Sequence, residues 1–227
     1  MTVLPDAEDP ERYHPDSAIR KYLNARAAGA LAPEPAAAPD VAAASLKAAA
    51  VHERWSVKTA ADPDAQALTA QAPTPTTIAA LTALAVPALL PPDGRSDGAE
   101  KTVWQLTATL QAFGREADGD YHMVLADAQG NTMIGEIPNP DDVTAPSYFG
   151  TQIANARTAF DSHFSLVENI RPPAQAAPGP AGTAGFQEVA VPVTLTGLGF
   201  FDFAHGQRGV APNAIELHPV INIVFNG

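Results

Sequence analysis

The feature that most constrains this chain is a change in its hydrophobic period near residue 100. Residues 102–113 (TVWQLTATLQAF) alternate apolar and polar positions, the pattern of a long, half-buried β-strand. The same two-residue period returns at residues 120–127, 132–137, 188–199 and 214–225. Residues 148–164 instead have apolar side chains at helical spacing. The pattern predicts a mainly β domain over residues 99–227.

The expected order is three strands, a helix and two strands. This is the chain order of the OB-fold, a five-stranded Greek-key barrel, and closing the barrel would remove the exposed edges of these apolar strands. We therefore expect an OB-like barrel with one helix between strands 3 and 4. An open antiparallel sheet with a helix packed on it is the alternative.

Residues 1–98 are rich in Ala and Pro and have few large apolar side chains. Short helices are expected at about residues 18–28, 41–54 and 78–84, the last capped by Thr77. Such a segment buries too little apolar surface to offset its own chain entropy. We expect residues 1–54 to form a partly helical arm that docks on a protein partner or a neighbouring subunit. Residues 55–98 are expected to connect this arm to the barrel and to pack on it.

Charge and composition exclude several classes of protein. The chain has 25 acidic and 13 basic residues, a net charge of −12, so a nucleic-acid partner is not expected. It has no cysteine, which excludes disulfides, thiolate metal sites and a cysteine nucleophile. No signal peptide or membrane span is expected, because the first ten residues are acidic and no apolar run is long enough. The compartment stays open.

Carboxylate and imidazole side chains form two pairs on the expected strands. Asp120 and His122 share one face of strand 2, and Glu216 and His218 share one face of strand 5. Such pairs can bind a divalent metal such as zinc or calcium, or act as an acid–base pair. The alternative is a structural network of paired side chains. We expect strands 2 and 5 to flank strand 1, which places the two pairs about 9–10 Å apart.

A third polar group lies in the segment 199–219 (GFFDFAHGQRGVAPNAIELHP). Its Phe residues and glycines favour core packing beside a tight loop. The functional alternative is a ligand-binding loop, because the connection between strands 4 and 5 borders the usual OB binding face. Aromatic side chains with an arginine can stack on a base or a sugar. The candidate residues of this loop are Asp202, His205, Gln207 and Arg208.

The turn Asp118-Gly119-Asp120 resembles a turn of staphylococcal-nuclease-like OB domains, which hold calcium with acidic residues. The resemblance stops at this turn. Tyr121 follows it in place of Thr, and the strand at 132–137 has no arginine for a phosphate. If the acidic and histidine residues form a metal-dependent hydrolase site, a nuclease-like activity is therefore only one possible form of it.

Longer stretches resemble a group of uncharacterised bacterial proteins. They are WSVKTAAD at residues 55–62, EADGDYHMVL at 116–125, TMIGEIP at 132–138 and GFFDFAHGQRGVAPNAIELHPV at 199–220. The resemblance covers about residues 55–225 and implies that residues 55–62 belong with the barrel. The group has no assigned activity, so the resemblance implies no catalytic residues.

Two functions remain open from the sequence. The first is a non-catalytic interaction or structural module that docks through its N-terminal arm and needs no cofactor. The second is a metal-dependent hydrolase that uses Asp120, His122, Glu216 and His218 as ligands or acid–base groups.

Overall fold

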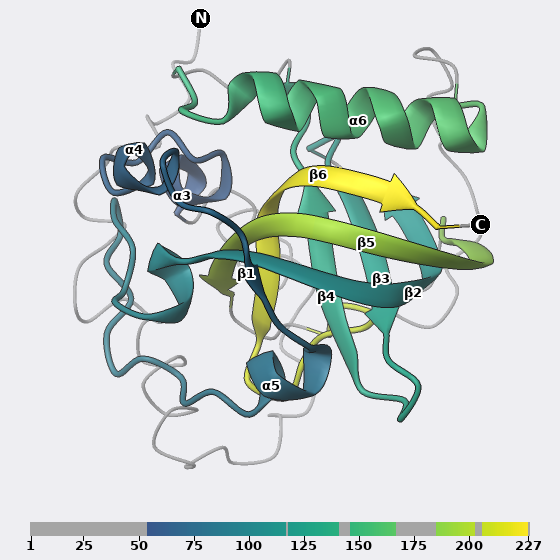
Figure 1. The fold of residues 1–227 in the computed structure, drawn as a ribbon, viewed down its shortest axis with the longest axis horizontal. Helices are drawn as coiled ribbons and strands as arrows, with labels where there is room; N and C mark the ends of the chain where they lie inside the picture. The colour runs from purple at the N-terminus through teal and green to yellow at the C-terminus, as the bar shows by residue number, and fades with distance from the viewer. Residues whose placement is uncertain (1–53, 117, 141–145, 167–184, 203–205, 227) are drawn as a thin grey trace, which may run out of the picture.

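The computed structural model describes residues 54–116, 118–140, 146–166, 185–202 and 206–226 (Figure 1). These residues form a mainly β structure around one six-stranded sheet with the order β1-β2-β3-β4-β6-β5, in which β2 also pairs with β5. Of the predicted N-terminal arm, only Arg54 is among the described residues. No helix in the described ranges is long and apolar enough to cross a membrane.

The long elements predicted from periodicity are confirmed. The strands are β1 (Thr74–Pro75), β2 (Val103–Arg115), β3 (Tyr121–Ala126), β4 (Thr132–Ile137), β5 (Gln187–Phe201) and β6 (Ile215–Phe225). The α-helices are α3 (Trp55–Lys58), α4 (Ala65–Leu68), α5 (Ile78–Thr82) and α6 (Gly150–Phe164), and Ala99–Lys101 form a 3₁₀ helix. Thr77 caps α5 as predicted, because its side chain accepts a hydrogen bond from Ala80 N. The expectation of five strands was incomplete, since the two-residue β1 adds a sixth strand parallel to β2.

The pairing of β4 positions the polar residues. β4 lies between β3, which is antiparallel to it, and β6, which is parallel to it. His122 on β3 is opposite Glu136 on β4, and Gly135 pairs with Leu217 on β6. The strands that carry the two histidines therefore flank β4. The expectation that they flank the first long strand, β2, was wrong, because it ignored the parallel β4–β6 pairing.

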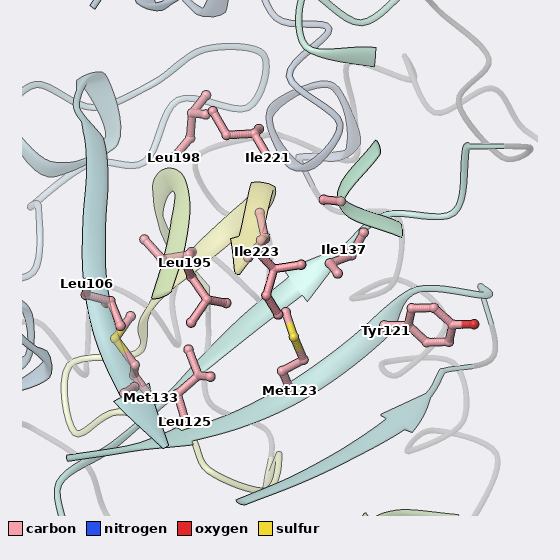
Figure 2. Close-up of a cluster of buried hydrophobic side chains, with 14 of the residues drawn as sticks. Leu106, Tyr121, Met123, Leu125, Met133, Ile137, Leu195, Leu198, Ile221 and Ile223 are labelled. Carbon is pink, nitrogen blue, oxygen red and sulfur yellow. The ribbon is translucent and has the colours of Figure 1, made fainter. Parts of the chain in front are cut away.

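The core lies between the strands and under α6. Figure 2 shows side chains from β2, β3, β4, β5 and β6 gathered in one cluster, among them Leu106, Met123, Met133, Leu195 and Ile223. α6 lies beside β6 (Figure 1) and adds Ile153 and Phe160 to the same core. The Phe160 ring centroid is 4.9 Å from those of Phe113 and Tyr121. Alternation along each strand thus directs one set of side chains inward and leaves the polar set on the outer face.

Buried ion pairs fix residues 54–101 to the sheet. Arg54 Nη1 lies 2.7 Å from Glu100 Oε1, which also accepts a hydrogen bond from the backbone N–H of Phe201 on β5. Arg95 pairs with Asp62 at 3.0 Å and donates to the carbonyl of Gly199. Residues of α4 and α5 belong to the same apolar cluster as the strands. This segment therefore shares its core with the sheet.

Candidate functional site

Three side chains form a row across the outer faces of β3, β4 and β6. Glu136, on the middle strand, places Oε1 3.0 Å from His122 Nδ1 and Oε2 3.0 Å from His218 Nδ1. One carboxylate therefore contacts two imidazoles, one on each neighbouring strand. The two histidines are two strand spacings apart, as expected, but the strand between them carries a charge that joins them.

The outer face that carries this row is covered, although the alternating pattern predicts a solvent-facing polar surface. Asp120, His122, Glu216 and His218 are each at most 3% exposed, and Glu136 is 7% exposed. Arg208 and Gly209 form part of the cover, since the Arg208 carbonyl lies 2.8 Å from His122 Nε2. At Gly209, which has φ +84°, a Cβ would lie 2.8 Å from Val124 Cγ1 on β3. Only glycine allows this loop to pack so closely on the strand.

His122 is held as an imidazolium. Its Nε2–H donates to the carbonyl of Arg208 at 2.8 Å, while Nδ1 faces carboxylate oxygens of Glu136 at 3.0 Å and Glu116 at 3.2 Å. Both ring nitrogens thus face acceptors, so both must carry a proton when no other cation is present. Burial lowers the pKa of His122, but the bonds to Glu116 and Glu136 outweigh it and raise the pKa to about 10.

His218 and Asp120 leave two buried polar atoms without a partner. His218 Nδ1 contacts Glu216 Oε1 at 3.1 Å as well as Glu136, which directs Nε2 toward Asp120. Nε2 lies 3.7 Å from Asp120 Oδ2, too far for a hydrogen bond. Neither atom has a hydrogen-bond partner in the part of the chain that the structure describes. The other oxygen, Oδ1, accepts a hydrogen bond from Asn139 N at 2.7 Å and fixes the carboxylate.

Acidic groups outnumber basic groups in this cluster. Burial raises the pKa of Glu216 to about 7, and the charge of Glu136 adds to the effect. Burial also raises the pKa of Asp118 to about 7, together with the charge of Asp120. Burial would raise the pKa of Glu136 too, but the positive charge of His218 and the bond from His122 hold it well below its usual value. The site thus favours added positive charge.

A buried lysine supplies part of that charge. Lys58 Nζ, on α3, lies 3.4 Å from Asp202 Oδ2 at the end of β5. Burial lowers the pKa of Lys58, but the charges of Asp202, Glu136 and Glu216 outweigh it and hold the pKa above its usual value. This lysine is a fixed positive neighbour of the cluster.

Two groups of side chains have the geometry of metal ligands. Asp120, Glu136 and His218 form one group, and Glu116, His122 and Glu136 form the other; within each group the ligand atoms lie within 4.8 Å of one another. Two ligand atoms about 2.1 Å from a tetrahedral ion are about 3.4 Å apart, close to the 3.7 Å between Asp120 Oδ2 and His218 Nε2. Glu136 belongs to both groups.

The structure brings together all four predicted metal ligands, Asp120, His122, Glu216 and His218. Sequence reasoning did not include Glu136 and Glu116 among them. Glu136 was detectable, because it is the only charged residue in the apolar strand at 132–137. The pairing of its strand, β4, with β6 was not detectable, because that contact joins segments about 80 residues apart.

The predicted ligand-binding loop is dispersed. Asp202 pairs with Lys58, and the Arg208 side chain pairs on the surface with Glu188 and lies over the Phe186 ring. Gln207 is half-buried, and His205 lies outside the described residues. Phe200 and Phe201 are buried, which confirms core packing for these two.

The comparisons with known proteins add no relative. No family model, no curated protein and no solved structure matches the chain.

Proposed function

We propose that this protein binds a divalent transition-metal cation between Asp120 Oδ2 and His218 Nε2, with Glu136 as a further ligand. One observation carries the proposal. These two atoms are buried, face one another at 3.7 Å, and have no hydrogen-bond partner among the described residues. A buried carboxylate oxygen without a donor is costly, and a cation between the two atoms would remove that cost.

The donor set supports a particular class of cation. One imidazole nitrogen and carboxylate oxygens suit Zn²⁺, Mn²⁺ or Fe²⁺ better than Ca²⁺ or Mg²⁺, which prefer oxygen alone. The hydrogen bond of His218 Nδ1 with Glu216 supports the same assignment. A metal-binding histidine commonly donates its other N–H to a carboxylate, which orients the ring.

The burial of the ligands favours a non-catalytic role. Asp120 and His218 are 0% and 1% exposed, whereas a catalytic metal keeps an open position for water or substrate. A cation here would join the start of β3 to β4 and β6, and so stabilise the structural module predicted from the sequence. Docking through residues 1–54 stays a prediction from the sequence.

A metal-dependent hydrolase is the second candidate. Glu116, next to His122, has a side chain that is 39% exposed, so one side of the cluster reaches solvent. Water could approach a metal on that side.

We infer further that the strands form an OB-like barrel. Three features support it: the path β2–β3–β4–β6–β5 returns to β2, β4 and β6 are parallel, and α6 lies between β4 and β5 in the chain.

The variant Asp120→Asn tests the metal site in the full-length protein. Asparagine keeps Oδ1 as the acceptor for Asn139 N but removes the carboxylate oxygen Oδ2, which makes no hydrogen bond. Metal-stripped wild type should bind Zn²⁺ or Mn²⁺ in a calorimetric titration, and saturation should raise its stability by about 2.7 kcal/mol at a hundredfold excess over Kd. The variant should bind at least about 100-fold more weakly.

Stability without metal provides the second readout. Because Asp120 Oδ2 makes no hydrogen bond and only faces His218 Nε2 at 3.7 Å, the metal-free variant should lose much less stability than the roughly 3–5 kcal/mol that breaking a fully bonded buried ion pair costs. Asp97→Asn, at a side chain that is 95% exposed, is the matched control and should bind like wild type. The proposal fails if metal-stripped wild type shows no saturable binding, or if Asp120→Asn binds as tightly as wild type.

A further inference from the structure

We infer that Lys58 weakens the binding of divalent cations at this site, because its buried ammonium group is a permanent positive charge beside the same acidic side chains. This inference rests on the proposed function, since it concerns the regulation of the site at Asp120 and His218. Lys58 is not a ligand of the metal and acts through its charge alone.

The position of Lys58 is the first support. Its helix, α3, contacts β6, the strand that carries Glu216 and His218. Lys58 Nζ lies 5.3 Å from the centroid of the Phe200 ring, and the centroid of the His218 ring lies 5.5 Å from the same centroid. Phe200 in turn pairs with Glu216 across β5 and β6. The ammonium group and the imidazole that would bind the metal therefore pack on one aromatic side chain.

The burial of Lys58 is the second support. The residue is 7% exposed, and its one ion pair among the described residues is with Asp202, at 3.4 Å. Burial lowers the pKa of Lys58, but the charges of Asp202, Glu136 and Glu216 outweigh it, so the lysine keeps its proton. A buried charge is screened little by water and salt, and it therefore acts on other charges across the cluster.

A second cation at the same ring is balanced differently. Arg54 also lies over the Phe200 ring, at 4.8 Å, but it makes two hydrogen bonds of 2.7 Å to the carboxylate of Glu100. Its charge is therefore neutralised outside the cluster. Lys58 differs because the charge of Glu136, in the cluster itself, acts on it in addition to its partner.

The ammonium group of Lys58 and a cation at His218 Nε2 are attracted by the same carboxylates, and they repel one another. Because this repulsion grows with the product of the charges, a divalent ion is opposed twice as strongly as a monovalent ion. The lysine also supplies positive charge to the cluster when no metal is bound. Lys58 thus favours the metal-free state over the metal-bound state.

Two substitutions in one ion pair test the inference in the metal-stripped, full-length protein. Lys58→Met removes a positive charge and should bind Zn²⁺ and Mn²⁺ at least about tenfold more tightly than wild type in a calorimetric titration. Asp202→Asn removes a negative charge that acts on Glu216, and it should bind both ions about tenfold more weakly. Both substitutions break the same ion pair, so damage to packing would weaken binding in both. Only an effect of charge shifts the affinity in opposite directions.

Two further variants serve as controls. Lys101→Met removes the same charge at a side chain that is 38% exposed, and it should bind within about twofold of wild type. Lys58→Arg keeps the charge and should stay close to wild type. Zn²⁺ and Mn²⁺ should shift by the same factor in Lys58→Met, because both carry two charges, whereas a rearranged ligand set would affect them unequally.

The outcomes separate this inference from the proposed function. Tighter binding by Lys58→Met with weaker binding by Asp202→Asn supports it. Saturable binding by wild type with unchanged or weaker binding by Lys58→Met overturns it and leaves the site of Asp120 and His218 standing. If Lys58→Met does not fold, unchanged or tighter binding by Asp202→Asn overturns it. Binding by Lys58→Met but not by wild type overturns the proposed function alone, and no binding by any variant overturns both.

Discussion

Two buried carboxylates of this protein differ in how far they are satisfied. Glu100 accepts hydrogen bonds from Arg54 and Ser96 and from the backbone of Phe201. Asp120 has one satisfied oxygen and one that faces His218 without a bond. A buried carboxylate with a structural role normally has hydrogen-bond partners for both oxygens, as Glu100 has. An oxygen without a partner, as in Asp120, indicates a position that a ligand could occupy. The number of hydrogen bonds to each carboxylate therefore distinguishes the structural ion pair at Glu100 from the candidate site at Asp120.

Replacing Glu100 with glutamine should destabilise the protein by about 3–5 kcal/mol, because it leaves the buried Arg54 guanidinium without a counter-ion. Denaturant unfolding of the full chain at neutral pH measures this loss. Asp97→Asn, at an exposed ion pair, should change stability by less than about 1 kcal/mol.

The contribution of Glu100 should depend on pH. Burial would raise its pKa, but the hydrogen bond and charge of Arg54 outweigh it and hold the pKa below its usual value of 4.5. A carboxyl whose folded pKa is depressed stabilises the fold above the unfolded pKa and loses that effect as the pH falls through the folded pKa. The stability difference between wild type and Glu100→Gln should thus be constant above about pH 5 and shrink on acidification. A difference that stays unchanged down to pH 3 would contradict this account.

The elements themselves were largely predictable from the sequence. Alternation placed all five long strands and assigned Asp120 with His122, and Glu216 with His218, to shared faces, because side-chain direction follows a local period. Periodicity carries no information about which strands pair. The parallel contact of β4 with β6 decides that Glu136 lies between the histidines, and it depends on packing of the whole sheet.

The register shift in β2 and the path of the loop at Gly209 were not predictable from the sequence pattern. β2 shifts register between Leu110 and Ala112, and both Ala112 and Phe113 are buried. Strict alternation along the strand would bury Ala112 and expose Phe113. The loop that covers the outer face was expected only as a tight, glycine-rich connection. Its close approach to Val124 depends on the tertiary structure.

Changing Gly209 to alanine should displace the loop that packs on Val124 and covers the cluster. Alanine at φ +84° costs about 1–2 kcal/mol, and its Cβ would overlap Val124. Gly130→Ala is the matched control, because Gly130 has the same φ with nothing within 4 Å of the added Cβ. Gly209→Ala should be less stable than the control by about a further 1–3 kcal/mol in denaturant unfolding. Equal losses of stability in the two variants would contradict close packing of this loop.

At the scale of the molecule, the sheet and residues 54–101 share one apolar core. Buried ion pairs link α3 and the segment before β2 to β5, and α4 and α5 share the apolar core. The sequence suggested that residues 55–98 pack on the barrel, but it contained no signal for the pairs Arg54–Glu100 and Arg95–Asp62. Such pairs join positions 46 and 33 residues apart, and only the folded chain brings them together.

If α3 and the strands unfold together, native-state hydrogen exchange should show it. The backbone N–H groups of Lys58 in α3 and of Thr59, which follows α3, should exchange only with global unfolding, as should those of β5 and β6. The exposed α4 residue Gln66, close by in the chain, should exchange faster and serves as the internal reference. Exchange of α3 well before the strands would show that this segment opens independently.

Anomalous diffraction from crystals grown with Zn²⁺ or Mn²⁺, measured at the absorption edge of that metal, tests the central claim most directly. We expect an anomalous peak within about 2.2 Å of Asp120 Oδ2 and of His218 Nε2. Crystals that bind the metal elsewhere, or that show Asp120 and His218 joined by a direct hydrogen bond with no peak between them, would contradict it.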